Sequence, residues 1–219
     1  MEITRAIEII SLMLISFVFG AIPTGYVLGK YLKGIDIREY GSGNPGTANV
    51  YRTLGKWAGI TTFAGDFLKG LLPTVLAMGF FYQRTGHWWI PVLAGVVAIA
   101  GHIWTPFLNF KGGKGVATSA GVFTAIMPLP IAGALIIFTI IVAITKHISL
   151  GSMGASIALP ILSFYFKSYA PLSIMAILVC ALIFCTHIPN IRRIISGKEL
   201  SYKHKKNQDA KRKQDAKNK

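Results

Sequence analysis

Long apolar runs alternate with short polar segments along the chain. Several charge-free runs exceed the roughly 18–20 residues that an α-helix needs to cross a bilayer. This pattern predicts an all-α, polytopic membrane protein, and the first run, which lacks a small-residue cleavage site, is interpreted as an uncleaved span. The predicted membrane-embedded runs cover residues 7–29, 57–82, 88–106, 115–145, 149–166 and 171–189.

Pro128 and Pro130 bear on how the run 115–145 is divided. Proline removes a helix hydrogen bond and forces a break, so the run can form two helices, 115–127 and 131–145, instead of one. Division gives seven transmembrane helices, and an undivided run gives six. The two halves would be only about 20–22 Å long, which is short of the roughly 30 Å apolar core. We therefore expect either that neighbouring helices cover them in part or that the protein is thin there.

Loop charge favours seven spans, with the N-terminus outside and the C-terminus in the cytoplasm. Segments rich in Lys and Arg remain on the cytoplasmic side of a membrane. The loop 30–56 is basic, and residues 192–219 hold 11 of the 23 Lys and Arg in the chain. Placing both segments inside requires an odd number of spans. All the glycine-rich loops then face the cytoplasm together.

The composition agrees with a membrane protein and adds a basic tail. Only 14% of the residues are charged and 53% are hydrophobic, yet the net charge is +15. A basic tail beside a bilayer is attracted to anionic lipid, which we prefer to nucleic-acid binding. We expect one transmembrane domain, residues 1–198, and a basic, disordered cytoplasmic tail, residues 199–219. An HxxxxD match at His204–Asp209 is attributed to chance, and Cys180 and Cys185 are interpreted as buried, reduced residues.

Four glycine-rich polar loops interrupt the apolar runs. Polar backbone is tolerated at membrane depth only where it is buried in protein or lines a wet cavity. The loops therefore indicate an elaborate polar site, and their amides, Lys and Arg suit it to anions. They read GSGNPGTANVYR (41–52), GDFLKG (65–70), FLNFKGGKGVAT (107–118) and HISLGS (147–152).

Two of these loops contain patterns found in nucleotide-binding proteins, but their contexts do not fit. GxGxxG at 41–46 lacks the preceding strand of a dinucleotide-binding fold, and GGKG at 112–115 lacks the Ser or Thr that follows a Walker lysine. Three interpretations remain for such loops. They are flexible connections, they are basic segments that only orient the protein, or they bind phosphate. In the last case the GGKG amides form an anion nest at a helix start, and Lys111 or Lys114 adds charge.

Acidic residues are too sparse for carboxylate-based chemistry. Asp66 is the only acid between Glu39 and Glu199, so the clustered carboxylates of a two-metal site are missing. We expect neither a metal nor another cofactor. Lys69 lies three residues from Asp66, on the same helix face. The pair is either a structural ion pair or a functional group within the membrane.

Histidine is the natural acid–base candidate near neutral pH. His187 and Asn190 lie three apart in the segment HIPN, close to a predicted helix end, where they can reach one pocket. The alternative is a structural histidine at the interface. His102 and His147 compete for the catalytic role because both flank the polar loops.

Together these motifs resemble those of the acyl-phosphate-dependent glycerol-3-phosphate acyltransferases, small integral enzymes of bacterial membranes. The resemblance covers residues 7–199. It implies transfer of an acyl group from fatty acyl phosphate to the 1-hydroxyl of glycerol 3-phosphate, giving lysophosphatidate and inorganic phosphate, on the cytoplasmic side of the inner membrane. It rests on SGNPGTAN (42–49), GDFLKG, GHIWTPFLNFKGGKGVAT (101–118), SLGS (149–152), HIPN and RRIISGKE (192–199).

The resemblance also assigns residues by matching motif positions. His187 and Asn190 would act on the reacting hydroxyl and carbonyl, although a substrate phosphate is an alternative base. A covalent serine intermediate is less attractive. The rival classes are a non-enzymatic anion carrier and an accessory membrane subunit. Residues assigned to holding phosphate, or to supporting the pocket, are Ser42, Asn44, Arg52, Lys69, Gly112, Gly113, Lys114 and Ser152.

Overall fold

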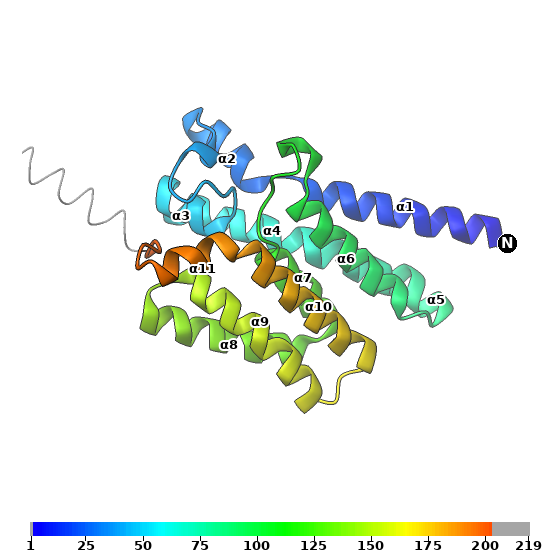
Figure 1. Cartoon of the computed structure of the whole chain (residues 1–219). Coiled ribbons are helices and arrows are strands. Elements are labelled where there is room, and N and C mark those ends of the chain that lie inside the picture. The colour runs from blue at the N-terminus through cyan, green and yellow to red at the C-terminus, as the bar shows by residue number, and fades with distance from the viewer. Residues whose placement is uncertain (1, 203–219) are drawn as a thin grey trace, which may run out of the picture.

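A computed structural model describes residues 2–202, and this part of the chain is built from helices without strands (Figure 1). The predicted all-α class is confirmed. The α-helices are α1 (Glu2–Ala21), α2 (Thr24–Lys33), α3 (Thr47–Leu54), α4 (Lys56–Ala77), α5 (Gln83–Thr85), α6 (Trp89–Ile103), α7 (Val116–Ile126), α8 (Pro128–Thr145), α9 (Ile148–Tyr165), α10 (Ala170–Thr186) and α11 (Ile188–Ile195). Short 3₁₀ turns η1 (Ile37–Glu39) and η3 (Pro106–Leu108) and a π-helical turn η2 (Met78–Tyr82) join them.

Five helical segments in the described residues are long and apolar enough to cross a membrane. A sixth forms if the bent pair α10 and α11 is counted as one span, and α7 is a shorter apolar helix. The polytopic membrane character is thus supported, and the count of seven stays a prediction that requires α7 to serve as a span. The five segments are Ile3–Ala21, Lys56–Thr85, Trp89–Leu108, Pro128–Thr145 and Ile148–Tyr165.

The predicted end of the first span, at residue 29, is wrong. α1 ends at Ala21, and α2 is a separate helix that begins at Thr24. Pro23 explains the break, because proline lacks the amide hydrogen and disfavours helical geometry in the residue before it. The break lets α2 approach the first glycine-rich loop so closely that a Cβ on Gly25 would overlap the carbonyl of Pro45.

The run 115–145 is divided, as expected, but its second half is longer than predicted. Pro128 stands in the first turn of α8, where its missing amide hydrogen costs nothing. α8 therefore begins at residue 128, and its 18 residues span about 27 Å. The shorter α7 is covered by neighbours: a Cβ on Gly70 or Gly121 would overlap backbone of the facing helix, so α4 and α7 meet closely.

The ion pair in α4 takes the structural alternative left open by the sequence. Asp66 and Lys69 lie buried with 2.8 Å between the carboxylate oxygen and the ammonium nitrogen. The Lys69 ammonium also donates to the carbonyl of Ile22, at 2.9 Å. That carbonyl lies at the break after α1, where helical partners end. Lys69 thus ties α4 to the break between α1 and α2.

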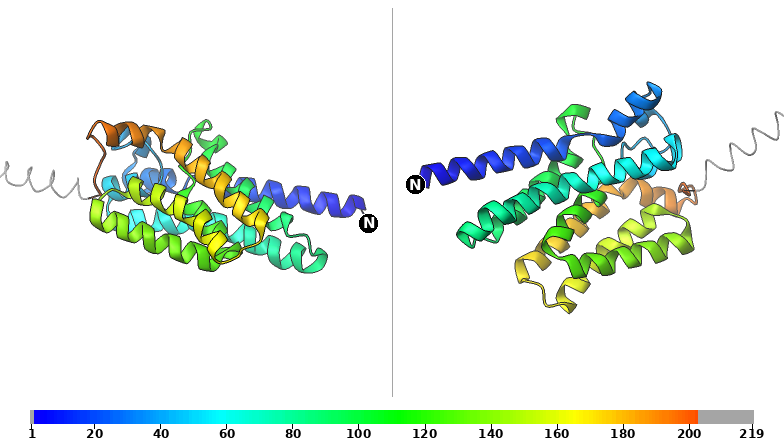
Figure 2. Two further views of the ribbon diagram at one scale, coloured as in Figure 1. Left: turned by 60° about the horizontal axis from the view of Figure 1, so that its bottom comes forward. Right: turned by 180° about the vertical axis from the view of Figure 1, so that it is seen from behind.

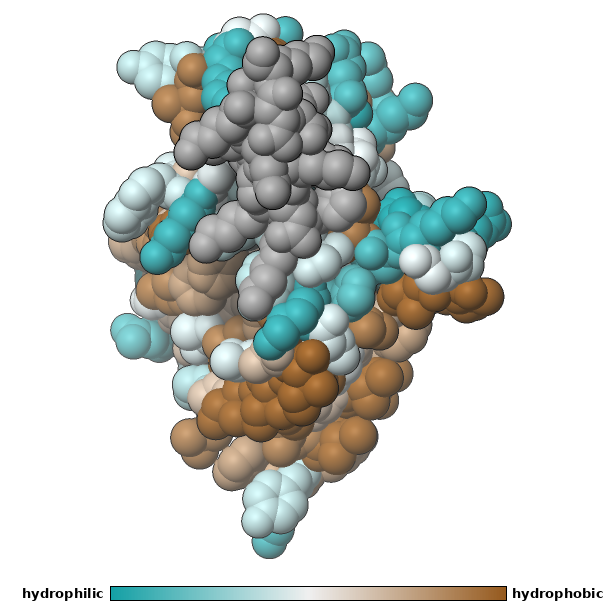
Figure 3. Space-filling model, turned by 90° about the vertical axis from the view of Figure 1, so that its left-hand side faces the viewer, coloured by the Kyte–Doolittle hydropathy of each residue, from teal (hydrophilic) through white to brown (hydrophobic). Residues whose placement is uncertain are grey.

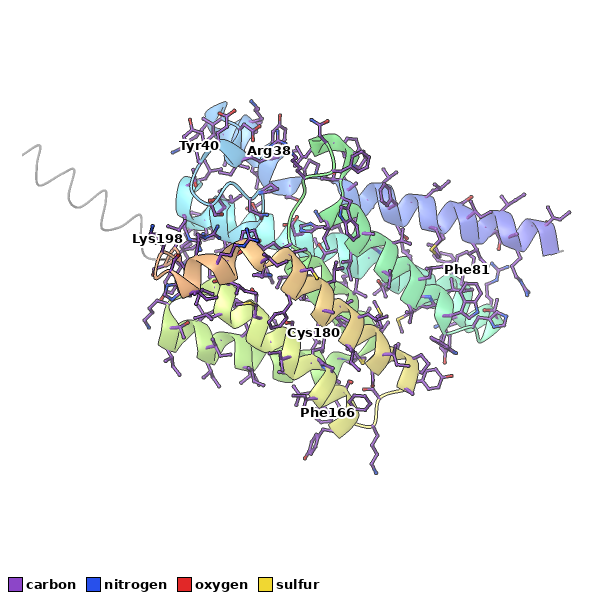
Figure 4. All side chains as sticks on the ribbon, in the orientation of Figure 1. Arg38, Tyr40, Phe81, Phe166, Cys180 and Lys198 are labelled. Atoms are coloured by element: carbon purple, nitrogen blue, oxygen red, sulfur yellow. The ribbon has the colours of Figure 1, made fainter. Side chains whose placement is uncertain are left out.

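The helices form two groups that meet at α7. α1 and α4 pack on α6, α8 and α10 pack on α9, and α7 contacts members of both groups. Figures 1 and 2 show the N-terminus at one end of the molecule and α3, α11 and the last described residues at the other. Figure 3 looks onto that second end and shows hydrophilic side chains over its upper part and hydrophobic ones over its lower part. In Figure 4 Lys198 lies at this end and Phe81 at the opposite one.

Three further predictions concern the domain boundary, the HxxxxD match and the two cysteines. The folded part extends to Tyr202, whose amide donates to the carbonyl of Lys146 at 3.2 Å, so the structure continues past the predicted boundary at residue 198. The HxxxxD match lies outside the described residues. Both cysteines are free thiols, as expected, but Cys185 is exposed and Cys180 half-buried. Cys185 lies on the outward face of α10, whose opposite face contributes Ala176, Val179 and Ile183 to the hydrophobic core.

Candidate functional site

One cavity of about 470 Å³ lies where the two helix groups meet. Its lining comes from segments that are distant in the sequence: the first glycine-rich loop, α3, α4 and α6–α11. Seven of the ten predicted site residues line it together, which supports their assignment to one site. These seven are Ser42, Asn44, Arg52, Lys114, Ser152, His187 and Asn190.

His187 stands at the bend between α10 and α11, which turn by 58°. Pro189 in the first turn of α11 favours this restart. The His187 side chain is 2% exposed, and its Nδ1 lies 2.8 Å from the carbonyl oxygen of Ile183. A carbonyl only accepts hydrogen bonds, so Nδ1 carries the proton and Nε2 is left as an acceptor. The bend therefore holds an imidazole in the tautomer that a general base needs.

Asn190 is fixed by charged groups on both ends of its amide. Its Oδ1 accepts a hydrogen bond from the Lys114 ammonium, and its Nδ2 donates to Glu199 Oε1 at 2.7 Å. Glu199 also accepts from Ser149 Oγ and from Arg193 Nε, each at 2.8 Å. This network joins the loop before α7, the start of α9 and the chain after α11.

Glu199 was missed by the sequence analysis, which placed it in the tail. Its position at the end of the motif RRIISGKE and the scarcity of other acids were the available signals. Burial alone would raise the pKa of its carboxyl group, but the hydrogen bonds from Asn190 and Arg193 outweigh burial, and the pKa lies below its ordinary value. Glu199 is therefore ionised at neutral pH and compensates part of the positive charge around it.

Two cations line the polar part of the cavity. Burial lowers the pKa of Lys114 to about 8, with Glu199 acting in the opposite direction and the charge of Arg52 acting in the same one. Burial also lowers the pKa of Arg52, yet a guanidinium starts so high that it remains charged. At neutral pH the cavity thus presents a positive charge to an incoming anion.

The guanidinium of Arg52 has N–H groups that can still donate hydrogen bonds to a ligand. Its Nη2 donates to the carbonyl of Leu200 at 3.0 Å. Its Nε is buried and finds no hydrogen-bond partner within residues 2–202. An unpaired buried donor is costly, so an anionic acceptor at this position would be stabilised. Arg52 is placed as a planar, charged group that is ready for phosphate oxygens.

The first glycine-rich loop is held by Asn49, which lines the cavity but has its side-chain amide bonded to the backbone of the loop. Asn49 accepts from the backbone amide of Ser42 at 2.8 Å and donates to the carbonyls of Ile37 and Tyr40 at 3.0 and 2.9 Å. Asn44 accepts from the amide of Gly46 at 2.9 Å, which closes a tight turn. Asn49 thus stabilises the loop from which Ser42 and Asn44 line the cavity.

The predicted amide nest at GGKG is wrong for its two leading glycines. The amide of Gly112 donates to the carbonyl of Ile103 at 3.0 Å, and the amide of Gly113 donates to that of His102 at 3.1 Å. Both amides are therefore occupied by protein. Glycine is needed because a Cβ on Gly113 would overlap the His102 ring. The glycines support the site by holding Lys114, and they and Lys69 line a separate space of about 10 Å³.

The three candidate histidines, His102, His147 and His187, differ in where they lie relative to the cavity. His102 lines the cavity, buried against Asp66 with 3.8 Å between Nδ1 and Oδ1. His147 lies outside the cavity lining and its Nδ1 is 2.6 Å from the carbonyl of Thr145. Ser152 lines the cavity, but its hydroxyl donates to the carbonyl of Ile148 in its own helix, at 2.9 Å. His187 is thus the histidine that sits among the predicted cations.

Away from the polar end the cavity becomes apolar. Its walls there come from α7, α8, α9 and α10, which share one hydrophobic core. The space is continuous with the cationic end, so a ligand that fits the whole cavity has an anionic head and an apolar tail. The apolar lining includes Ala120, Phe123, Ile131, Ala134, Leu159, Ala176, Val179 and Ile183.

Comparison with curated proteins agrees with this geometry. The sequence profile of a family described as "Glycerol-3-phosphate acyltransferase" matches residues 10–197. A glycerol-3-phosphate acyltransferase of Trichlorobacter lovleyi is 45% identical over 188 residues, which cover 86% of this chain and 94% of that protein. The enzyme of that name from Bacillus subtilis is 43% identical over 188 residues, with the same two coverages.

Comparison with solved structures gives the same result. A crystal structure of PlsY, an integral membrane glycerol 3-phosphate acyltransferase, in its glycerol 3-phosphate form has a TM-score of 0.82 and 36% identity, covering 89% of this chain and 95% of that one. Its lysophosphatidic acid form has a TM-score of 0.80, 35% identity and the same coverages. The match extends over nearly all of both chains. This chain therefore belongs to the glycerol-3-phosphate acyltransferase family of integral membrane enzymes.

Proposed function

We propose that the protein transfers an acyl group from fatty acyl phosphate to the 1-hydroxyl of glycerol 3-phosphate. The products are 1-acyl-glycerol 3-phosphate (lysophosphatidate) and inorganic phosphate, and the step is the first acylation of phospholipid synthesis. The observation that carries the proposal is the single cavity with Arg52 and Lys114 at one end and a continuous apolar extension. Such a cavity suits an acyl phosphate, whose anionic head and hydrocarbon tail need both environments.

The cationic end serves two phosphate groups, one from each substrate. Arg52 offers a planar fork and Lys114 a point charge, and Ser42 and Asn44 supply polar groups beside them. The solved relatives were crystallised in glycerol 3-phosphate and lysophosphatidic acid forms, which agrees with a site for a glycerol phosphate head. In this proposal Lys69, Gly112 and Gly113 support the pocket from behind its surface.

The reaction we propose is a direct displacement. The 1-hydroxyl oxygen forms a bond to the acyl carbonyl carbon, and the bond from that carbon to the phosphate oxygen breaks. The hydroxyl proton passes either to Nε2 of His187 or to a substrate phosphate, and the released phosphate takes the electron pair. Asn190, held by Lys114 and Glu199, orients the reacting groups. Because the leaving group is good, positioning and charge stabilisation supply much of the rate, and no metal or other cofactor takes part.

We place the protein in the bacterial inner membrane with its N-terminus outside and its polar end in the cytoplasm. The basic segments lie at the end of the molecule opposite the N-terminus (Figure 1), and seven spans result if α7 counts as one. A cysteine-free background tests the orientation. Leu129→Cys, in the first turn of α8, should label from outside, and Lys198→Cys only from inside. Labelling of both from one side contradicts this topology.

The choice of donor is the direct test of the proposed reaction. Purified protein is incubated with labelled glycerol 3-phosphate and either palmitoyl phosphate or palmitoyl-CoA. We expect lysophosphatidate with the acyl phosphate and none with the thioester, and the rate should persist in excess EDTA. A rate that requires the thioester, or one abolished by EDTA and restored by Mg²⁺, overturns the proposal.

A further inference from the structure

We propose that the apolar end of the cavity is a closed floor that sets the length of the acyl chain, with Ala176 as its smallest member. This inference rests on the proposed function, because it assigns the apolar extension to the acyl chain of the donor. The floor consists of four residues, one from each helix of the apolar wall. They are Phe123 of α7, Ile131 of α8, Leu159 of α9 and Ala176 of α10.

Chain direction makes these four residues the deepest part of the cavity lining. α7 and α9 start at the polar end and run away from it, whereas α8 and α10 start at the far end and return. The lining of α7 and α9 stops at Phe123 and Leu159, and that of α8 and α10 starts at Ile131 and Ala176. Each is thus the cavity residue of its helix that lies furthest from the polar end.

The floor is sealed from lipid, whereas the upper cavity is not. Phe123 and Ala176 are fully buried, Leu159 is 5% exposed and Ile131 is 7% exposed. Nearer the mouth, the lining residues Phe63 of α4 and Leu135 of α8 are 43% and 39% exposed. A lipid chain can therefore enter from the side, between α4 and α8. A chain that extends away from the polar end then meets the four floor residues.

The depth of the cavity follows from helix geometry. Ala176 and His187 are eleven steps apart along α10 and the bend, about 16 Å at 1.5 Å per residue. Seven residues of α9 separate Leu159 from Ser152, about 10 Å. Cys180, labelled on α10 in Figure 4, lines the cavity between these levels. Carbon–carbon bonds of about 1.5 Å advance a zigzag chain by roughly 1.25 Å per carbon, so the space holds roughly 8–13 carbons.

The depth of the cavity predicts how kcat/KM depends on the length of the acyl chain. A methylene that the cavity cannot hold is left at its wet, polar end, and this exposure costs roughly 0.8 kcal/mol, which is about fourfold in kcat/KM. The cost should begin when the chain is longer than the cavity is deep. A side chain that fills the floor moves this break to shorter donors, and one that deepens the floor moves it to longer donors.

The test compares floor variants over a series of donors, from decanoyl to stearoyl phosphate, in one detergent. Donor solubility cancels if each rate is divided by the wild-type rate with the same donor. We expect Ala176→Leu to retain its rate with decanoyl phosphate and to lose roughly 15-fold with palmitoyl phosphate, the equivalent of two methylenes. Phe123→Leu should shift the preference in the opposite direction.

Ala181→Leu is the matched control. It makes the same change on the same helix, but Ala181 is exposed and lies outside the cavity lining, so its relative profile should be flat. If Ala176→Leu fails to fold, Ala176→Val and Phe123→Leu carry the same test with smaller changes in packing.

Two failures can be told apart. If the wild-type protein uses acyl phosphates but Ala176→Leu and Phe123→Leu give profiles as flat as Ala181→Leu, the acyl chain leaves through the opening between α4 and α8 and the floor assignment is wrong. If the wild-type protein uses no acyl phosphate of any length, the proposed function fails, and the floor assignment falls with it.

Discussion

Asn190 and Glu199 are joined by a hydrogen bond of 2.7 Å from Nδ2 to Oε1, which fastens the segment after α11 to the candidate catalytic bend. The Glu199 side chain is 3% exposed and ion-paired with Arg193 at 2.8 Å. A residue that the sequence placed in a disordered tail is therefore part of the polar network. Its charge offsets those of Lys114 and Arg52, and its oxygens set the orientation of the Asn190 amide.

Glu199→Gln should lower both stability and turnover, because the amide cannot accept charge-assisted bonds from Arg193 and Asn190 together. The expected loss is about 1.5–3 kcal/mol in the free energy of unfolding, measured by thermal unfolding in detergent. The folded-state pKa of Glu199 lies below its ordinary value of 4.5. The wild-type advantage should therefore be full above about pH 4.5 and disappear as pH falls below it. Glu39→Gln, at an exposed acid, is the control and should match the wild type.

Arg52→Lys should weaken substrate binding more than chemistry. Lysine keeps the charge but loses the fork that grips phosphate with two bonds. Loss of one charge-assisted bond costs about 1.5–3 kcal/mol, roughly 10- to 150-fold, and we expect it mainly as a raised KM for glycerol 3-phosphate. Arg38→Lys is the matched control, because Arg38 is paired with Asp36 at 2.7 Å and does not line the cavity. Equal kinetics in both variants would remove Arg52 from the site.

The pKa of Lys114 predicts an alkaline limit to activity. Burial lowers this pKa to about 8, so the free enzyme loses a positive charge at a lower pH than an exposed lysine would. The KM for glycerol 3-phosphate should rise above about pH 8, approaching tenfold per pH unit. Lys114→Arg, which keeps its charge, should move the limit upward even if its rate is lower. Lys111→Met, at an exposed lysine of the same loop, should keep the wild-type profile. A KM that stays flat through this pH range contradicts the role of Lys114.

His187→Ala separates the two candidate bases. If Nε2 of His187 takes the proton, kcat should fall by roughly 10²–10⁴, with KM little changed. A smaller fall indicates that a substrate phosphate is the base and that His187 orients the hydroxyl. His147→Ala is the control, since His147 lies outside the cavity lining and bonds to its own turn. Wild-type kinetics in His187→Ala would remove His187 from the site.

Prediction from the sequence succeeded where the type of residue alone determines the local structure or environment. Apolar runs of membrane length gave the class, Pro128 marked the division of α7 from α8, and charged motif residues such as Arg52 and Lys114 reached one cavity. It failed where the path of the backbone determines which groups form hydrogen bonds. The amides of Gly112 and Gly113 donate to protein carbonyls, and only the fold shows that those acceptors lie within reach.

The same limit explains Glu199 and Lys69. Composition shows a basic tail starting near residue 199, but no pattern reveals that Ser149 and Asn190 supply hydrogen bonds to a carboxylate there. The family resemblance places Lys69 among the residues that hold phosphate or support the pocket, because it lies in the motif GDFLKG. The structure shows it paired with Asp66, behind the cavity wall.

Rapid mixing with labelled palmitoyl phosphate tests the central claim, that the cavity joins donor and acceptor for direct transfer. Phosphate and lysophosphatidate are quantified with and without glycerol 3-phosphate. We predict equal amounts of both products when the acceptor is present and no phosphate burst when it is absent. A burst of one phosphate per enzyme without acceptor, which signals an acyl-enzyme intermediate, would contradict the account.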